Sequence, residues 1–241
     1  MTQKNKPLAA ILSSSFLAAT TLAGADTLEI LSAAGGLQEN SLLHGNTLYL
    51  IQALNLGVYH LSGGKAEPVR HLPLLMPTRG GAAAVEGNVL AVAGRNGWTM
   101  LYDVSNPSAP FLRSLYATGT DSFNDTLTSG LALEGNYMAV AVAGGQEGAN
   151  SARMEIVDIS NMDAPVRVGQ YDLWQSDVTG FATERGQVIG FSGDVVYLHL
   201  PKGLLTLNVS DRTNPQFASR LAYCPSRRRV QCHSTGRGCL R

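Results

Sequence analysis

The chain has 241 residues, of which 44% are hydrophobic and 15% are charged, and its formal net charge at pH 7 is zero. Abundant core-forming residues and few charges exclude a disordered, collagen-like or coiled-coil protein. The net charge of zero is not uniform along the chain: residues 26–221 carry 11 Lys and Arg against 18 Asp and Glu, a net charge of −7. An acidic body argues against nucleic acid or an anionic membrane as a partner.

The first 25 residues have the three-part pattern of a secretory signal. Lys4 and Lys6 make a basic start, an apolar run follows within residues 8–22, and Ala23-Gly24-Ala25 predicts cleavage after Ala25. The run is shorter than the roughly 20 apolar residues that a membrane-spanning helix needs. We therefore expect an exported protein, periplasmic, extracellular or at the cell surface, with no membrane span once the signal is removed.

The body of the chain, residues 26–221, repeats a pattern. Residues 101–111 (LYDVSNPSAPF), 156–166 (IVDISNMDAPV) and 207–217 (LNVSDRTNPQF) share one frame, and a degraded earlier copy ends at Pro68. A Gly-Asn or Gly-Asp pair precedes each copy and begins at Gly45, Gly87, Gly135 or Gly193. Self-similarity at a period of roughly 20 to 50 residues is typical of solenoids and propellers.

Each repeat is expected to form four short strands. Gly-Asn between apolar runs is the strongest short signal for a β-hairpin. The units cover about residues 37–72, 78–116, 127–172 and 178–221, and the first strand of the second and third units is rich in small residues. This pattern predicts an all-β fold, a β-propeller or partial propeller of about four blades with the small-residue strand innermost. A β-sandwich is the alternative.

The repeat motif itself has a structural explanation. An Asp followed two residues later by Ser and then Asn is suited to capping backbone N–H groups of a loop, and a Pro after the loop suits an outer edge strand. The residues that carry this motif are Asp103, Ser105, Asn106, Pro110, Asp158, Ser160, Asn161, Pro165 and Pro215.

These residues also carry a family resemblance. Residues 154–171 (MEIVDISNMDAPVRVGQY) and 101–115 (LYDVSNPSAPFLRSL) resemble the LVIVD-repeat family of secreted bacterial and archaeal propeller-like proteins. The resemblance spans about residues 37–221. It implies a propeller-like fold and an exported, surface or periplasmic location, and it implies no particular reaction.

The tail, residues 222–241, leaves the pattern and holds all three cysteines. Cys224, Cys232, His233 and Cys239 lack the paired C-x-x-C spacing typical of a zinc site. An Arg-rich patch without aromatic partners also does not indicate nucleic-acid binding. Two explanations remain open, a disordered tail or the product of a reading-frame shift, and the second implies a longer authentic protein with more blades.

No catalytic motif is present, since the chain has no G-x-S-x-G elbow, no H-E-x-x-H and no phosphate-binding loop. The richest polar segments, residues 119–126 and 175–179, precede the third and fourth inner strands and should lie at one end of the propeller near its axis. Asp121, Asp125 and Asp177 are candidates for holding a metal there, although a solvated loop is the simpler interpretation. No metal, cofactor or catalytic residue is otherwise predicted.

The function hypothesis that follows is an exported propeller that acts as a binding or surface-interaction module for an extracytoplasmic ligand or protein. One alternative is a lactonase-like propeller hydrolase with a metal held by the acidic axial loops. The other is a truncated propeller fragment without function.

Overall fold

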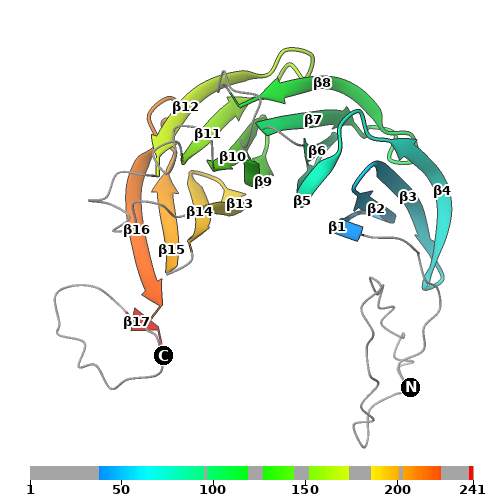
Figure 1. Ribbon diagram of the computed structural model, residues 1–241, viewed down its shortest axis with the longest axis horizontal. Helices are drawn as coiled ribbons and strands as arrows, with labels where there is room; N and C mark the ends of the chain where they lie inside the picture. Colours follow the sequence, from blue (N-terminus) through cyan, green and yellow to red (C-terminus); the bar gives the residue numbers. More distant parts are fainter. Residues whose placement is uncertain are drawn as a thin grey trace, which may run out of the picture.

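The structure, a computed structural model, describes residues 38–94, 97–118, 127–143, 152–173, 186–200, 203–223 and 239–240. These residues form four sheets, each with four antiparallel strands that are consecutive in the chain, and the fourth sheet has a short fifth strand in addition (Figure 1). The predicted propeller-type fold of four-stranded blades is therefore confirmed.

The strands of each blade run from the inner side of the molecule to its convex outer side. Blade 1 contains β1 (Gln38–His44), β2 (Thr47–Gln52), β3 (Asn55–Ser62) and β4 (Lys65–Pro73). Blade 2 contains β5 (Thr78–Glu86), β6 (Val89–Gly94), β7 (Trp98–Asp103) and β8 (Phe111–Ala117). Blade 3 contains β9 (Leu127–Glu134), β10 (Tyr137–Ala143), β11 (Arg153–Asp158) and β12 (Val166–Asp172). Blade 4 contains β13 (Gln187–Ser192), β14 (Val195–Leu200), β15 (Gly203–Asn208) and β16 (Gln216–Tyr223).

The first two strands of every blade are joined by the predicted Gly-Asx hairpin turn. Gly45, Gly87, Gly135 and Gly193 have φ values of 57°, 52°, 56° and 54°. Positive φ is unfavourable for residues with a Cβ, so the recurring glycine is the local reason why each blade begins with a tight hairpin.

The blades follow one another in an arc (Figure 1). The first strands β1, β5, β9 and β13 contact each other in succession along its inner side, which confirms that the small-residue strands are innermost. Strands β4, β8, β12 and β16 form the convex side. Blades 1 and 4 lie at the two ends of the arc, and among the described elements no blade packs between them.

Three hydrophobic clusters join consecutive blades. We call the face of a blade directed to the following blade its leading face, and the opposite face its trailing face. Each cluster combines the leading face of one blade with the trailing face of the next. Pairs that represent the three junctions are Ile51 with Val92, Leu101 with Val140, and Ile156 with Leu205, all with exposed fractions of 0%. Burial on both faces explains why the central strands are almost continuously apolar.

The inner strands of blades 3 and 4 approach each other closely. A Cβ placed on Gly130 in β9 would lie 2.5 Å from both the backbone nitrogen and the carbonyl oxygen of Val188 in β13. The neighbouring Ser129 hydroxyl donates a hydrogen bond to the carbonyl of Gly186, at the start of the same blade. The small residues of the inner strands thus allow backbones to meet near the axis.

Two details differ from the pattern read in the sequence. Pro68 lies inside β4, opposite Tyr59, whereas Pro110 precedes β8; Pro68 is therefore not the equivalent of the other motif prolines. In the tail, Cys239 and Leu240 form a short strand, β17, that pairs in parallel with the end of β16.

Gly130→Ala is expected to destabilise the protein by about 1 to 3 kcal/mol, because the added methyl group would force two backbones apart. Gly190→Ala is the matched control in the neighbouring inner strand, where a Cβ would have ordinary contacts of 3.6 Å with Tyr197. Urea unfolding of both variants measures the difference, and equal losses of stability would contradict the close-approach explanation.

Candidate functional site

The blades present two different ends. The turn end carries the Gly-Asx turns and the loops between the third and fourth strands. In blades 2, 3 and 4 these loops are residues 104–110, 159–165 and 209–215, which we call the motif loops. The connection end carries the links from one blade to the next.

The motif loops are held by their own side chains. In blade 2, Asp103 Oδ1 accepts a hydrogen bond of 2.9 Å from the Ser105 backbone N–H, and Asn106 Oδ1 accepts one of 3.3 Å from that of Ser108. The same two contacts recur in blades 3 and 4. Their acceptors are the side chains of Asp158, Asn161, Asn208 and Asp211. These are the capping contacts expected of Asp and Asn in tight loops.

The two repeated sequence columns also contact each other. The carbonyl of Asn88, in the Gly-Asn turn, accepts a hydrogen bond of 2.8 Å from the N–H of Val104 at the start of the motif loop. Ile159 and Asn136 form the same bond in blade 3, as do Val209 and Asp194 in blade 4. The hairpin turn and the motif loop of each blade therefore form one hydrogen-bonded unit.

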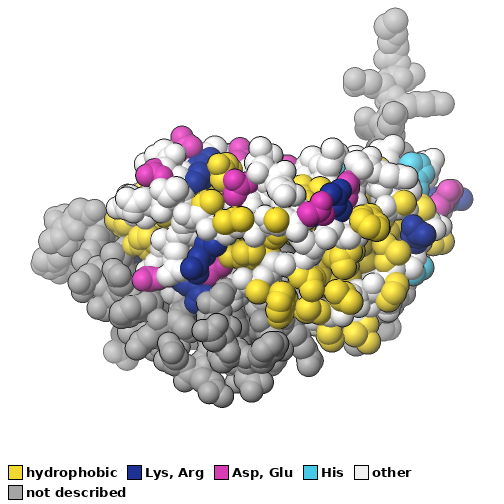
Figure 2. All heavy atoms as spheres, turned by 90° about the horizontal axis from the view of Figure 1, so that it is seen from above, with side chains coloured by type: hydrophobic (Ala, Val, Ile, Leu, Met, Phe, Trp, Pro, Cys, Tyr) yellow, Lys and Arg dark blue, Asp and Glu magenta, His cyan; other side chains and the backbone are white. Residues whose placement is uncertain are grey.

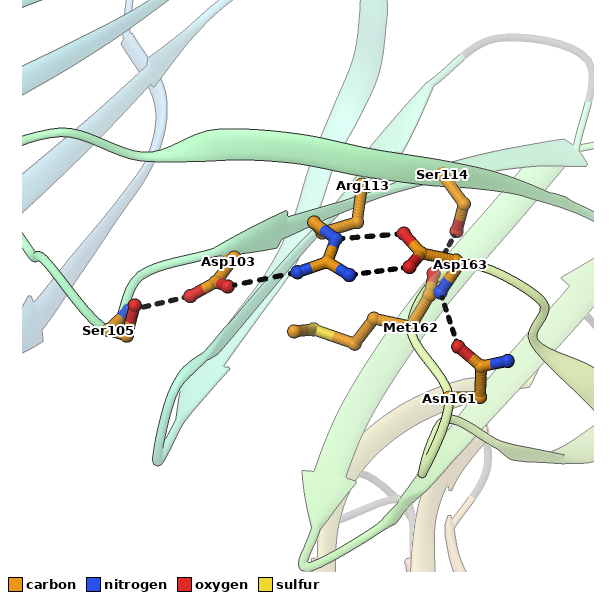
Figure 3. Close-up of polar contacts among 7 residues, drawn as sticks. All are labelled: Asp103, Ser105, Arg113, Ser114, Asn161, Met162 and Asp163. Carbon is orange, nitrogen blue, oxygen red and sulfur yellow. Dashed lines mark hydrogen bonds and ion pairs between the residues drawn. The ribbon is translucent and has the colours of Figure 1, made fainter.

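The motif loop of blade 3 is fastened to the outer strand of blade 2 (Figure 3). Arg113 in β8 binds both carboxylate oxygens of Asp163, with distances of 2.8 and 2.5 Å, and its remaining nitrogen lies 3.3 Å from Asp103. The adjacent Ser114 hydroxyl donates a hydrogen bond of 2.5 Å to the carbonyl of Met162. Bidentate Arg–carboxylate geometry adds direction as well as strength to this contact.

A carbonyl at one position of the motif loop faces the preceding blade at all three junctions. This position is three residues before the motif proline, and we call its carbonyl the clasp carbonyl. That of Pro107 accepts a hydrogen bond of 3.0 Å from the hydroxyl of Tyr49 in blade 1. The clasp carbonyl of Met162 accepts a hydrogen bond from the Ser114 hydroxyl. The clasp carbonyl of Arg212 lies against Gly169 of blade 3, where a Cβ would collide with the carbonyl oxygen.

The junction of blades 3 and 4 uses the Arg212 side chain in addition. Its guanidinium carbon lies 5.2 Å from the ring centroids of both Tyr137 in blade 3 and Phe191 in blade 4. It also donates hydrogen bonds to the carbonyls of Gly193 and Val209. A cation between two aromatic rings is a favourable arrangement.

A buried ionic cluster lies between blades 2 and 3. Glu155 has an exposed fraction of 0%, and its carboxylate accepts hydrogen bonds of 2.6 Å from Arg153 Nε and 2.6 Å from the hydroxyl of Tyr116. Arg167 approaches the same carboxylate at 3.4 Å. Burial and the negative charge of Glu155 raise the pKa of Tyr116 well above its usual range, so the phenol remains a donor.

Hydrogen-bond partners lower the pKa values of the exposed carboxylates in and next to the motif loops. The Arg113 hydrogen bond lowers the pKa of Asp163, and the backbone N–H of Ser105 is the largest cause of the lowered pKa of Asp103. The Thr213 hydroxyl and N–H lower the pKa of Asp211. At the first junction, burial raises the pKa of Tyr49 to about 12.

The motif residues predicted from the sequence come together at the turn end, whereas the metal candidates Asp121, Asp125 and Asp177 lie outside the described residues. In the part of the chain that the structure describes, no group of three His, Cys, Asp or Glu side chains is placed to hold a metal ion. The sequence pattern does not reveal Arg113 or Glu155, because neither residue repeats: Val168 stands at the position of Arg113 in blade 3, and Leu205 stands at the position of Glu155 in blade 4.

The connection end of blade 1 exposes hydrophobic side chains. Leu54 is 58% exposed in the β2–β3 turn and Leu75 is 61% exposed in the link to blade 2. The carbonyl of Leu54 accepts a hydrogen bond of 2.8 Å from Leu74, which holds the turn and the link together. Seen from the convex side, acidic and basic side chains are interspersed while hydrophobic ones gather over the half that carries blade 1 (Figure 2).

Fold and inter-blade contacts together define a propeller-type repeat protein. The family model of the LVIVD repeat matches residues 81–118 and 127–173, which are blades 2 and 3. The match supports the resemblance to the LVIVD-repeat family that the motif residues of these two blades predicted.

One structural comparison shows the same type of fold. A crystal structure of a protein from Lactobacillus plantarum is similar, with a TM-score of 0.60 and 14% identity, and the match covers 79% of this chain and 57% of that protein. The chain thus spans less than two thirds of the length of that neighbour. A chain from the S. cerevisiae complex of dbp5 with nup159 and gle1 matches with a TM-score of 0.46 and 10% identity, over 74% of this chain and 46% of that one. A search of curated proteins found no match.

The lowered pKa of Asp163 makes the stability of the junction between blades 2 and 3 depend on pH. Because its pKa is lower in the folded than in the unfolded protein, its contribution to stability is present above an ordinary Asp pKa of about 4 and is lost as the pH falls through the folded value. Asp163→Asn should therefore reduce the free energy of unfolding at pH 7 more than at pH 3. Urea titrations at both pH values measure this, with the exposed Glu67→Gln as control; an equal loss at both values would contradict it.

Removal of the buried Glu155 side chain is expected to cost about 3 to 5 kcal/mol, because Arg153 would remain buried without its carboxylate. The measurement is chemical unfolding of Glu155→Ala. The exposed Glu67→Ala in β4 serves as the control and should change stability by less than about 0.5 kcal/mol. A small effect at Glu155 would show that water reaches Arg153 in its place.

Proposed function

We propose that this protein is an exported binding module whose connection end engages an extracytoplasmic ligand or protein. The amino-terminal pattern of residues 1–25 supports export, and the acidic net charge of residues 26–221 favours a cationic, sugar or basic partner over nucleic acid. Within the described residues, no helix is long and apolar enough to cross a membrane.

The observation that carries the proposal is the exposed pair Leu54 and Leu75. Two large hydrophobic side chains are more than half exposed, on a turn and a link that the backbone hydrogen bond from Leu74 holds in place. Hydrophobic side chains that gather on a rigid surface mark interaction sites more often than scattered ones do.

A second argument concerns the polar segments that precede β9 and β13 in the sequence. Ser129 and Gly130 contact Gly186 and Val188, so the segments that lead into β9 and β13 enter neighbouring strands. These segments contain Asp121 and Asp177. In this proposal, oxygen atoms of these two segments contribute to the ligand site together with the hydrophobic contacts of blade 1.

The proposal is tested by photo-cross-linking in intact cells. A photo-reactive amino acid in place of Leu75 should yield adducts, whereas the same replacement of Phe111, which is 67% exposed at the opposite end, should not. Adducts from both positions, or from neither, would contradict a binding surface at the connection end. The cross-linked protein should be exported and should begin at Asp26.

Metal content distinguishes the hydrolase alternative. A binding module is expected to purify without a stoichiometric metal ion. A metal that is bound at one equivalent by the wild-type protein, and lost in the double variant Asp121→Ala with Asp177→Ala, would favour the lactonase-like hydrolase instead.

A further inference from the structure

Blade 4 carries donor hydroxyls for a junction that the described chain does not contain. Tyr197 in β14 occupies the position of Tyr49 in β2, because each is the third residue of its strand and pairs with the middle of the third strand. Ser219 in β16 occupies the position of Ser114 in β8, because each follows the bulge in its strand.

In the earlier blades these two positions hold the hydroxyls that bind clasp carbonyls. Tyr49 donates to Pro107 across the first junction, and Ser114 donates to Met162 across the second. The first and second junctions each have one such hydroxyl, whereas at the third junction the clasp carbonyl lies against Gly169. The leading face of blade 4 has both.

The environment of the two blade 4 hydroxyls differs from that of their counterparts. Tyr49 is 0% exposed beneath blade 2, whereas Tyr197 is only partly buried and Ser219 is exposed. The Ser219 hydroxyl lies 2.7 Å from that of Thr206, which replaces the Leu101 found at this position in blade 2. Thr206 thus adds a hydroxyl at a position that is apolar in the three preceding blades.

From this we infer that the leading face of blade 4 is a docking surface for a further LVIVD-type blade, whose clasp carbonyl accepts a hydrogen bond from Tyr197 or Ser219. The new junction would continue three that the chain already forms with the same pair of faces. It would also extend the arc toward the length of the Lactobacillus plantarum neighbour, of which this chain spans 57%.

A second copy of this chain is not the expected partner. The clasp carbonyls of Pro107 and Met162 accept hydrogen bonds within the chain, and that of Arg212 faces Gly169. Blade 1 has the short turn Gly63-Gly64 in place of a motif loop. A second copy therefore offers no clasp carbonyl to Tyr197. This surface is separate from the connection end, so the inference does not depend on the proposed function.

The test appends a fifth blade to the full chain. A copy of residues 119–173, which includes the matched repeat of blade 3, follows Arg241, and a parallel version carries a copy of residues 78–118. We expect at least one of these to raise the Tm and to slow amide exchange in β14 and β16. In that background, Tyr197→Phe with Ser219→Ala should lower the Tm by about 2 to 4 °C.

The same substitutions in the unextended chain are the control. There, Tyr197→Phe with Ser219→Ala should shift the Tm by less than about 1 °C, whereas Tyr49→Phe and Ser114→Ala should each lower it by about 2 to 4 °C. The inference is overturned if neither added blade raises the Tm. It is also overturned if the blade 4 substitutions lower the Tm by the same amount in the presence and absence of the added blade. A dimer of the unextended chain in light scattering that Tyr197→Phe dissociates would also overturn it, in favour of self-association.

Discussion

The clasp carbonyl of each motif loop is the contact on which the succession of blades depends. Hydrophobic faces hold consecutive blades together, but apolar packing has no direction and would tolerate sliding of one sheet over the next. A backbone carbonyl directed at the preceding blade sets the position along the sheet. Its own loop is rigid because Asp103 or Asp158 caps it, and because the Gly-Asn turn accepts its first N–H.

The partner of this carbonyl varies although its position does not. Tyr49 reaches the carbonyl from the second strand, Ser114 from the fourth, and at Gly169 the backbone itself comes close enough to exclude a side chain. The repeat thus preserves the geometry of the loop and leaves the complementary face free to change. Arg212, between two aromatic rings, shows how one junction replaces a hydroxyl contact with a cation.

Buried charge adds specificity to one junction. Glu155 binds Arg153 within blade 3, and the hydrogen bond from Tyr116 forms only when blade 2 packs against blade 3. Replacement of such a group by an apolar side chain of similar volume is often neutral in stability. A neighbouring blade without Tyr116 would leave one oxygen of the buried Glu155 carboxylate without this hydrogen bond, which costs about 1 to 3 kcal/mol. We therefore interpret the cluster as a contact that favours blade 2 as the neighbour of blade 3. Arg113 and Asp163 act in the same way at the surface of this junction.

The sequence alone determined the blades of this protein, because their signals are local. Gly87 and Asn88 specify a hairpin by backbone conformation, and Asp103, Ser105 and Pro110 specify a capped loop within a few residues of each other. The recurrence of these signals predicted the propeller-type fold and the resemblance to the LVIVD repeat. Only the tertiary structure decided what joins the blades. Arg113 meets Asp163 from 50 residues away, and Tyr116 meets Glu155 from 39. Such pairs occur once and leave no repeated signal, because they depend on how two finished blades face each other.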